Sequence, residues 1–523
     1  MLDLIVADAR VYDGTGAPPR DADVGIRGDR ISSVGDLREI PARERIPANG
    51  RCLCPGFIDV HTHSDGHVLM APDAPSRIFQ GVTTEVAGNC GDSAAPSAEE
   101  RTVSPPDAEG GRGYSWRTVA EYRRSVEQAR PAVNLALLIG HNRLWADAMG
   151  YGNRRADSDD LRRMVVALER GLDEGGWGFS TGLLYSPGRY ADREEIVVLA
   201  RAAARREGLY ATHLRNEAGG LLEALDEALE IGAKAGIRVQ ISHVKAAGRA
   251  HWPLMGPALD RLRRAVAAGR PVAADRYPYT ASSTSLKTIL PSDEAAGTYD
   301  EILARLRHPA DRTRIRARTL EEHADDYWNT ILIASSPTGN GLEGRRLVEI
   351  AAEWGMAPVD AAFRLLENDA LETFAIFFSM SEKDMYRVLE EPWVMIGSDG
   401  SIRTTSGPLS GGHPHPRSFG AFARFLRMAL DGHTVPLAEA IRKMTSLPAR
   451  TFGFRDRGVI REGAFADLVV FDPARARDRA TYERPLQYAE GFETVIVNGV
   501  VTLRDGRLTG CRGGRFLSRE ERH

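Results

Sequence analysis

Two histidines stand one residue apart in the stretch PGFIDVHTHSD, where an apolar run ends and an acid follows. Side chains at positions i and i+2 of a β-strand point to the same face, so His61 and His63 can converge on one object. A metal ion is the obvious candidate for that object. The pair alone is weak evidence, so the ends of the other strand-like segments must be compared with it.

Four more metal-competent residues stand near the ends of further apolar segments. They are Cys90 in TTEVAGNC, His213 in LYATHLR, His243 in RVQISHVK and Asp399 in WVMIGSDG. Each has an ordinary interpretation, because a lone strand histidine is usually a hydrogen-bonded structural residue and an isolated cysteine usually packs in the core. Together with the histidine pair they make six such residues at the same end of strand-like segments, which favours a metal site.

The ligand types indicate the metal. Imidazole and thiolate together suit Zn²⁺ better than Mg²⁺ or Ca²⁺, which prefer oxygen ligands. A bound zinc ion would hold the Cys90 side chain as a thiolate. The residues allow one ion or two, and the sequence leaves that number open.

A rhythm of strand followed by helix begins near residue 55 and positions these residues. The segment DDLRRMVVALERGLDEG has apolar residues at the spacing of one helical face, which predicts an amphipathic helix over 159–175. Eight strands are expected, and they match a (β/α)8 TIM-like barrel, whose enzymes carry their chemistry at the carboxyl ends of the strands. The expected strands cover residues 56–63, 83–90, 134–142, 177–183, 209–215, 238–245, 271–279 and 393–400.

Both ends of the chain have a different character, with short strands separated by turns. LIVADARVYDG near the start and TVIVNGVVTLRDGRLTG near the end are examples. The simplest arrangement is one small β-sandwich built from both termini. We therefore predict sandwich parts at 1–54 and 459–523, the second with a C-terminal tail, around a barrel at 55–458.

Two irregular segments interrupt the barrel pattern. A long extra segment between the seventh and eighth strands, roughly 286–372, contains the apolar strand TILIASS. We predict an insertion on the active face of the barrel at about 286–346. The segment RTVSPPDAEGGRG at 101–113 is polar and rich in proline and glycine, which is typical of a mobile loop.

The composition fits a folded soluble protein and excludes several classes. The chain has 523 residues, of which 42% are hydrophobic and 27% charged, with a net charge of -4. It shows neither a nucleic-acid footprint nor an apolar run long enough to span a bilayer, and its start lacks the pattern of a signal peptide. We therefore expect a cytoplasmic protein with no nucleic-acid or membrane partner. The 4 cysteines are too few for a disulfide scaffold in a chain of this size.

The motifs PGFIDVHTHSD, GNCG, THLRNE, ISHVK and GSDG, in this order and between two β-rich ends, resemble those of the amidohydrolase superfamily. More narrowly, the sequence is similar to the N-acyl-D-amino-acid deacylases, or D-aminoacylases, over nearly its whole length. The His-x-His pair is general to the superfamily, whereas Cys90 is the narrower mark. Hydantoinases and dihydroorotases use a carboxylated lysine on the fourth strand as bridging ligand, but WGFSTGLLYS contains no lysine. In the deacylases the cysteine takes that role.

The resemblance implies a zinc-dependent hydrolase that converts an N-acyl-D-amino acid and water into a carboxylate and a D-amino acid. It implies a tight zinc site at Cys90, His213 and His243. A second, weaker or vacant metal position would consist of His61, His63 and Asp399. By the same resemblance, the carboxylate accepts a proton from the metal-activated water and delivers it to the departing amine.

A free amino-acid product carries a planar, negative carboxylate, so its site requires a fixed cation. Arg417 in HPHPRSFG fits because a guanidinium binds both oxygens, and the matching arginine binds the substrate carboxylate in the family. Lys245, close to one of the metal histidines, is the second candidate. The resemblance adds Tyr185, Tyr277 and Ser283, whose counterparts contact the substrate or the developing oxyanion. Surface or packing roles are the alternative for all five.

Other interpretations stay open at this point. The same fold could act on another N-acyl compound, a cyclic amide or a dipeptide ending in a D-residue, although the missing lysine argues against ring opening. A non-catalytic barrel relative would show gaps in the ligand set, whereas all six residues are present. Selectivity for D substrates follows only from the resemblance. The sequence decides neither the side-chain preference nor the oligomeric state.

Overall fold

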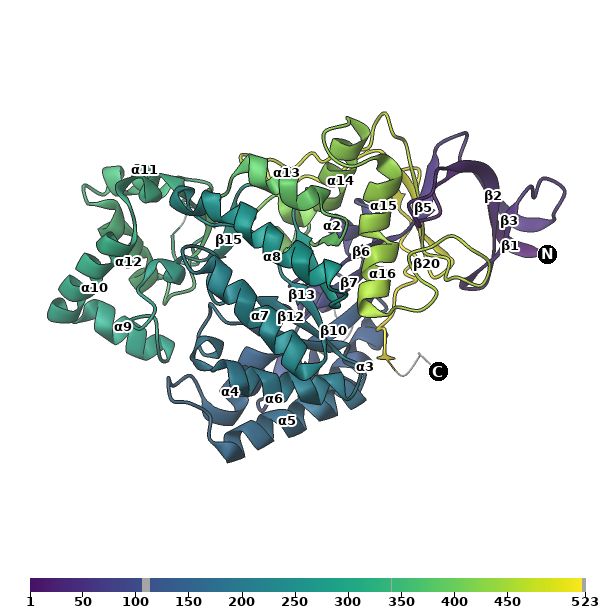
Figure 1. Cartoon of the computed structure of the whole chain (residues 1–523). Helices are drawn as coiled ribbons and strands as arrows, with labels where there is room; N and C mark the ends of the chain where they lie inside the picture. The colour runs from purple at the N-terminus through teal and green to yellow at the C-terminus, as the bar shows by residue number, and fades with distance from the viewer. Residues whose placement is uncertain (106–112, 340, 520–523) are drawn as a thin grey trace.

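The computed structural model describes residues 1–105, 113–339 and 341–519 of the chain. Three parts lie next to one another in Figure 1: a β-rich part built from segments near both ends of the chain, a central barrel with its helices, and a smaller helical module on the opposite side. The predicted (β/α)8 barrel is confirmed, and segments from both ends of the chain share one further sheet, whereas a small β-sandwich domain stays a prediction.

Eight parallel strands form the barrel, and their order around it follows their order in the chain. Thr62, after the first strand, bridges Gly400, after the last one, and this contact joins the two ends of the sheet. The strands are β6 (Phe57–Asp59), β7 (Val82–Ala87), β10 (Asn134–Gly140), β11 (Gly178–Gly182), β12 (Leu209–His213), β13 (Arg238–Ile241), β14 (Val272–Arg276) and β18 (Val394–Ile396).

The barrel strands are covered on both faces. Every residue of β7 and of β10 is buried. Parallel strands in this situation have nearly continuous apolar sequences, which is why NLALLIG was recognisable as a strand. Ile58, Val86, Leu138 and Ala211, from four different strands, belong to one apolar cluster. This packing fixes the strand ends and therefore the loops that follow them.

Helices cover the outside of the barrel (Figure 1). The helix predicted over 159–175 is α5 (Ser158–Asp173), and it buries Met164 and Leu172 on one face. It begins at Asp157, whose carboxylate accepts hydrogen bonds from two backbone N–H groups of the first turn. The other helices are α1 (His67–Met70), α2 (Pro75–Ile78), α3 (Val119–Ala129), α4 (His141–Met149), α6 (Arg193–Ala204), α7 (Leu221–Ala235), α8 (Met255–Ala267), α13 (Glu382–Glu390), α14 (Arg417–Leu430), α15 (Leu437–Met444) and α16 (Ser446–Phe452).

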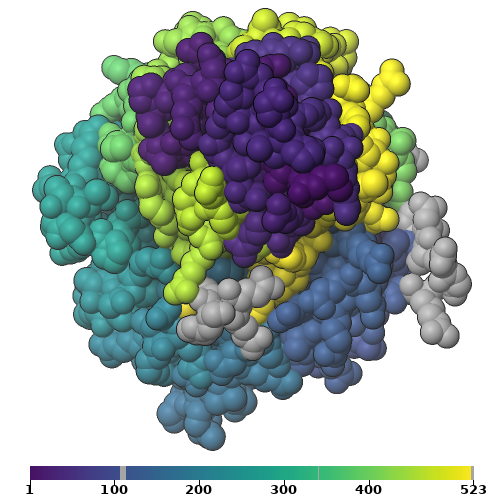
Figure 2. Space-filling view, turned by 90° about the vertical axis from the view of Figure 1, so that its right-hand side faces the viewer, coloured from purple at the N-terminus to yellow at the C-terminus, as the bar shows by residue number. Residues whose placement is uncertain are grey.

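The two ends of the chain share one sheet. The N-terminal strand β5 pairs antiparallel with the C-terminal strand β19, with Cys54 opposite Val469. Figures 1 and 2 show the purple N-terminal segments beside the yellow C-terminal ones. The sheet has the order β22–β21–β20–β19–β5–β1–β2–β3, with β4 beside β1. Its strands are β1 (Leu2–Val11), β2 (Arg20–Arg27), β3 (Arg30–Gly35), β4 (Ala42–Pro47), β5 (Cys52–Pro55), β19 (Leu468–Phe471), β20 (Phe492–Val497), β21 (Val500–Arg504) and β22 (Arg507–Leu508).

A helical module lies between β14 and β18 in the chain and has its own apolar core, which includes Leu286, Ile302, Trp328 and Phe363. It contains a three-stranded antiparallel sheet in the order β15–β17–β16. The predicted insertion at about 286–346 lies within this module. Its elements are β15 (Ser282–Ser285), α9 (Tyr299–Arg307), α10 (Pro309–Glu322), β16 (Ile331–Ser335), α11 (Leu347–Glu353), α12 (Pro358–Asn368) and β17 (Phe374–Phe377).

The remaining sequence predictions concern the loop at 101–113, membrane-spanning helices and the domain boundaries. The first residues of the loop predicted at 101–113 form β8 (Arg101–Val103), which pairs antiparallel with β9 (Tyr114–Trp116) just after the loop. Residues 106–112 lie outside the described part of the chain. None of the helices in the described ranges has the length and apolar character that a bilayer span requires. The division of the chain near residues 54 and 458 stays a prediction.

Candidate metal centre

The structure brings the six predicted metal-type residues together at one rim of the barrel. Each lies at the carboxyl end of a barrel strand or in the loop that follows it, and the strands concerned are β6, β7, β12, β13 and β18. Their ligand atoms form two groups, and within each group the atoms lie within 4.8 Å of one another. The first group is Cys90, His213 and His243, and the second is His61, His63, Cys90 and Asp399.

Cys90 is common to both groups and lies between the histidines. Its Sγ is 3.6 Å from Nδ1 of His213 and 3.6 Å from Nε2 of His243. A tetrahedral zinc with Zn–S of about 2.3 Å and Zn–N of about 2.1 Å would separate sulfur and nitrogen by about 3.6 Å. The observed separations therefore fit zinc ligation without rearrangement of these side chains.

The second group extends from the same sulfur toward Asp399. Nε2 of His61 is 3.3 Å from Sγ of Cys90 and 3.4 Å from Oδ1 of Asp399. Nε2 of His63 is 3.1 Å from the same carboxylate oxygen. Two adjacent ligand sets that share one sulfur thus offer two neighbouring candidate metal positions.

Backbone conformation at the rim is unusual. Cys90, His243 and Asp399 have φ angles of 54°, 34° and 51°, in the left-handed region that side chains other than glycine rarely adopt. Gly88, just before the cysteine, also has a positive φ, and a Cβ there would lie 2.0 Å from the carbonyl oxygen of Leu138. Such strain is concentrated at functional sites, where the surrounding structure holds it in place.

The charged groups at the rim shift one another's pKa values. Burial opposes ionisation of Cys90, but the charge of His61 and hydrogen bonds from three histidines hold the pKa of the thiol well below its usual value. Burial likewise opposes ionisation of Asp399, but Arg417 and the histidines keep the pKa of that carboxyl well below its usual range. Burial lowers the pKa of His63, yet Asp399 and Cys90 outweigh it and raise that pKa to about 10. A divalent cation would displace the histidine protons and neutralise these anions.

Sequence reasoning missed Asp275, the residue before the end of β14. Its Oδ1 lies 3.3 Å from Nδ1 of His61 and accepts a hydrogen bond of 2.9 Å from the backbone N–H of His243. Its Oδ2 accepts one of 2.6 Å from Gln240. The carboxylate therefore orients ligands from two strands. Asp275 lies in the seventh expected strand, at 271–279, to which no ligand had been assigned. A carboxylate in that strand was the signal that could have identified it.

Glu217 is the second residue that the sequence did not reveal. Its Oε1 is 3.0 Å from Nδ1 of His243, and its Oε2 is 3.4 Å from Nε2 of His213. Nζ of Lys245 donates to the same Oε1 over 2.5 Å. Burial opposes ionisation of Glu217, but Lys245 and both histidines hold the pKa of its carboxyl below the usual range. Its position four residues after the THLRNE histidine was the available signal.

Arg417, at the start of α14, reaches the centre of the site. Its Nη1 is 2.7 Å from Oδ2 of Asp399, and its Nη2 donates to the carbonyl oxygen of Ser283 over 3.2 Å. The guanidinium carbon lies 4.9 Å from the centre of the Tyr277 ring. Nδ1 of His415 accepts a hydrogen bond of 3.0 Å from the backbone N–H of Arg417, which fixes the loop before the helix.

The remaining predicted substrate residues lie close by. Tyr185 places its ring centre 4.8 Å from that of His213, and its hydroxyl is 3.3 Å from Oγ1 of Thr284, next to Ser283. Tyr277 is fully buried, and within the described chain its hydroxyl has no hydrogen-bond partner. Lys245 is only 7% exposed and lies against Glu217 rather than free in the site.

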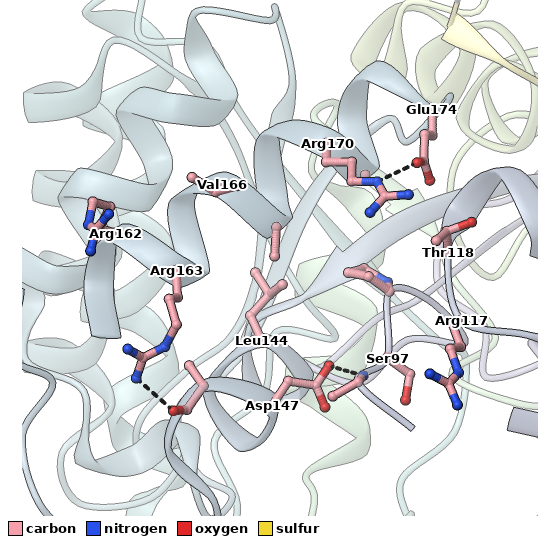
Figure 3. Close-up of a pocket in the computed structure, with 15 residues that line it drawn as sticks. Ser97, Arg117, Thr118, Leu144, Asp147, Arg162, Arg163, Val166, Arg170 and Glu174 are labelled. Atoms are coloured by element: carbon pink, nitrogen blue, oxygen red, sulfur yellow. Dashed lines mark hydrogen bonds and ion pairs between the residues drawn. The ribbon is translucent and has the colours of Figure 1, made fainter. Parts of the chain in front are cut away.

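A cavity of about 610 Å³ lies elsewhere, between residues 96–98, the start of α3, and helices α4 and α5 (Figure 3). Its lining residues include none of the predicted site residues. The charged groups at its edge are paired, for example Arg170 with Glu174 at 2.7 Å, while Asp147 accepts from the N–H of Ala98 at 2.9 Å. The metal-ligating chemistry is therefore at the barrel rim and not in this cavity.

The fold and the site together define a barrel with a metal centre at its rim, the arrangement of metal-dependent hydrolases. The model of the amidohydrolase family matches residues 44–503. The chain therefore belongs to the amidohydrolase family, on the D-aminoacylase branch to which its motifs had pointed.

Two relatives from Alcaligenes xylosoxydans xylosoxydans show the extent of the similarity. An N-acyl-D-glutamate deacylase is 37% identical over 99% of this chain and 97% of its own length. A D-aminoacylase is also 37% identical, over 99% of this chain and 98% of its own length. Among solved structures, the N-acyl-D-glutamate deacylase from Bordetella bronchiseptica, complexed with zinc and a phosphonate inhibitor, is 36% identical. It has a TM-score of 0.83, with 99% of both chains covered.

Proposed function

We propose that this chain is a zinc-dependent deacylase that hydrolyses an N-acyl-D-amino acid to a carboxylate and a free D-amino acid. The observation that carries the proposal is the position of Cys90 Sγ, 3.6 Å from a nitrogen of both His213 and His243. A thiolate in the place of the carboxylated lysine is the feature that separates deacylases from ring-opening relatives. Full-length similarity to a D-aminoacylase supports the substrate class.

Cys90, His213 and His243 would hold the zinc ion, and His61, His63 and Asp399 would form the second position. The donor set fits, because imidazole and thiolate suit zinc and the sulfur–nitrogen separations match its bond lengths. Zinc bound there supplies Lewis acidity toward the scissile carbonyl and the attacking water.

Asp399 is the proposed general base and then general acid. Its low pKa keeps it a carboxylate, able to accept a proton from the attacking water. Its Oδ1 faces His61 and His63, and its Oδ2 faces Arg417. The carboxyl group thus lies between the metal ligands and the proposed substrate cation, from where it can return the proton to the leaving nitrogen.

Arg417 is the proposed partner of the substrate α-carboxylate, because a guanidinium can donate to both of its oxygens. Tyr277 supplies a buried hydroxyl without a partner in the described chain, and such a donor can stabilise the developing oxyanion. Tyr185 and Ser283 lie at the same side of the site and complete the proposed substrate contacts. Lys245 is the remaining predicted contact, although its ammonium group already donates a hydrogen bond to Glu217.

A substrate panel tests the proposed function. Zinc-loaded protein is assayed against paired N-acetyl-D- and N-acetyl-L-amino acids, with the metal content of the protein measured alongside. The proposal predicts turnover of D substrates and little or none of their L enantiomers. Turnover of the L series alone, or of neither series by fully loaded protein, would contradict it.

A further inference from the structure

We propose that Glu217 is a positioning residue that fixes both histidines of the Cys90 zinc site through one carboxylate, and that Lys245 acts through Glu217. This inference rests on the proposed zinc centre but not on the identity of the substrate. Glu217 lies in the loop after β12 and Lys245 in the loop after the neighbouring β13, so their contact is set by the tertiary fold.

Each of the two imidazole rings lies between the cysteine sulfur and the Glu217 carboxylate. His213 directs Nδ1 toward Sγ at 3.6 Å and Nε2 toward Oε2 at 3.4 Å. His243 directs Nε2 toward Sγ at 3.6 Å and Nδ1 toward Oε1 at 3.0 Å. A metal-binding imidazole needs a lone pair on one nitrogen and carries its hydrogen on the other. The carboxylate faces the nitrogen that must carry this hydrogen in both rings.

One carboxylate therefore lies against the outer nitrogen of both ligands. Its approach to Nε2 of His213 is a charge contact and not a hydrogen bond, because that nitrogen has no hydrogen-bond partner among the described residues. In the proposed arrangement the carboxylate favours hydrogen on the outer nitrogen of both rings and restrains the angle between them. The ring centres of His213 and His243 are 4.5 Å apart, with an interplanar angle of 78°. Glu217 is 8% exposed, and its backbone oxygen accepts a hydrogen bond of 2.7 Å from Ala247, which ties its loop to the one after His243. Groups that contact the outer nitrogen of metal-binding histidines commonly contribute about 10- to 100-fold to metal affinity.

Lys245 supplies the charge that balances Glu217. Its Nζ lies 2.5 Å from Oε1 of Glu217, 3.1 Å from the carbonyl oxygen of His243 and 2.8 Å from Nδ1 of that residue. An ammonium group only donates hydrogen bonds, and Nδ1 must also donate when Nε2 binds a metal. The ammonium therefore donates to the carboxylate and the carbonyl oxygen in the metal-bound form.

This arrangement distinguishes two roles for Lys245. If Lys245 contacts the substrate, its removal would weaken substrate binding and leave zinc binding unchanged. As a partner of Glu217, it would weaken zinc binding when removed, because the buried carboxylate would lose the hydrogen bond of 2.5 Å that holds its Oε1 beside His243. Arg417 would then be the cation that receives the substrate α-carboxylate.

The test compares Glu217→Gln, Lys245→Met and the double variant by zinc affinity, measured by chelator competition at fixed pH. We expect Glu217→Gln to bind zinc about 10- to 100-fold more weakly than the unaltered protein. Lys245→Met should also lose affinity, and the double variant should lose less than the product of the two single effects because both act through one carboxylate. Cobalt(II)-loaded Glu217→Gln should show an altered visible spectrum, since the ligand geometry around the ion changes.

Glu227→Gln is the matched control, because Glu227 pairs with Arg215 at 2.8 Å and is not among the metal-type groups. It should retain the zinc affinity of the unaltered protein. Glu217→Asp keeps the charge but cannot reach both rings, so it should show an intermediate affinity. This variant keeps the test decisive if Glu217→Gln does not fold.

Zinc affinity within about twofold of the unaltered protein in Glu217→Gln or Glu217→Asp would overturn the role of Glu217. A higher KM in Lys245→Met at unchanged zinc affinity would overturn the role of Lys245 and assign it to the substrate. The zinc-affinity and cobalt-spectrum measurements need no turnover of any substrate, and unchanged zinc affinity in Lys245→Met would by itself overturn the role of Lys245. Failure of the inference is therefore distinguishable from failure of the proposed deacylase function.

Discussion

At the scale of single residues, Asp399 uses its two oxygens for two different partners. Oδ1 faces the imidazoles of His61 and His63, whereas Oδ2 forms an ion pair of 2.7 Å with Arg417. A group in this position can transfer a proton between the metal side and the substrate side of the site. Its proposed role in catalysis can be tested apart from metal binding by Cys90, His213 and His243, because that ligand group does not include it.

Asp399→Asn should lower kcat by about 100- to 10,000-fold, since the amide cannot accept the proton from water. Zinc at the Cys90 group should stay bound, as measured by elemental analysis after dialysis. Asp431→Asn is the control, because Asp431 pairs with Arg427 at the end of α14 and should leave kcat unchanged. Turnover of Asp399→Asn close to that of the unaltered protein would refute the proton-transfer role.

Arg417→Lys should raise KM by about 10- to 100-fold, because a lysine cannot form the two parallel bonds that a guanidinium makes with a carboxylate. The effect on kcat should be smaller. Steady-state kinetics with the best D substrate of the panel measures both values. Arg424→Lys is a comparison on the same helix, where Arg424 donates to the carbonyl oxygen of Pro278. A KM equal to that of the unaltered protein would argue against the carboxylate contact.

Metal binding should release protons at neutral pH. The pKa of His63 is raised to about 10, and that of His243 is also raised, because the neighbouring anions outweigh burial. Both must be neutral to bind zinc, so affinity should increase with pH up to about that of the highest histidine pKa. Calorimetric titration in two buffers with different ionisation enthalpies counts the protons. Binding without proton release, and with affinity independent of pH, would be inconsistent with these charge states.

At the scale of elements, the predicted strands extended beyond the observed ones. His61 and His63 were expected on one face of a strand at 56–63, but β6 ends at Asp59 and both lie in the following loop. Asp59 accepts the backbone N–H groups of His61 and Ser398, and these bonds replace the strand pairing there. The ligand types and their order were predictable, whereas the left-handed loop conformations that aim them were not.

A capping residue on the outer ring offers a stability test that leaves the site intact. Asp157 accepts from two backbone N–H groups at the start of α5. Asp157→Ala should lower the free energy of unfolding by about 0.5–2 kcal/mol and reduce Tm, with zinc affinity unchanged. Thermal unfolding followed by circular dichroism measures it, with the exposed neighbour Asp159→Ala as control. An unchanged Tm would mean that the cap contributes nothing measurable.

At the scale of the whole molecule, the barrel was predictable because its parallel strands produce apolar runs at regular spacing. The shared sheet of the two termini followed from their common short-strand character, but its strand order did not, because β5 and β19 are more than 400 residues apart in the chain. Asp275 and Glu217 were missed for the same reason. Asp275 contacts His61 and Glu217 contacts His243, which come from other strands, and only the closed barrel brings these pairs together.

The most direct test of the central claim is anomalous diffraction at the zinc absorption edge from crystals of the zinc-loaded protein. The proposal predicts a peak about 2.3 Å from Sγ of Cys90 and about 2.0–2.1 Å from Nδ1 of His213 and Nε2 of His243. A zinc ion bound elsewhere, or one at the rim that the Cys90 sulfur does not touch, would contradict it.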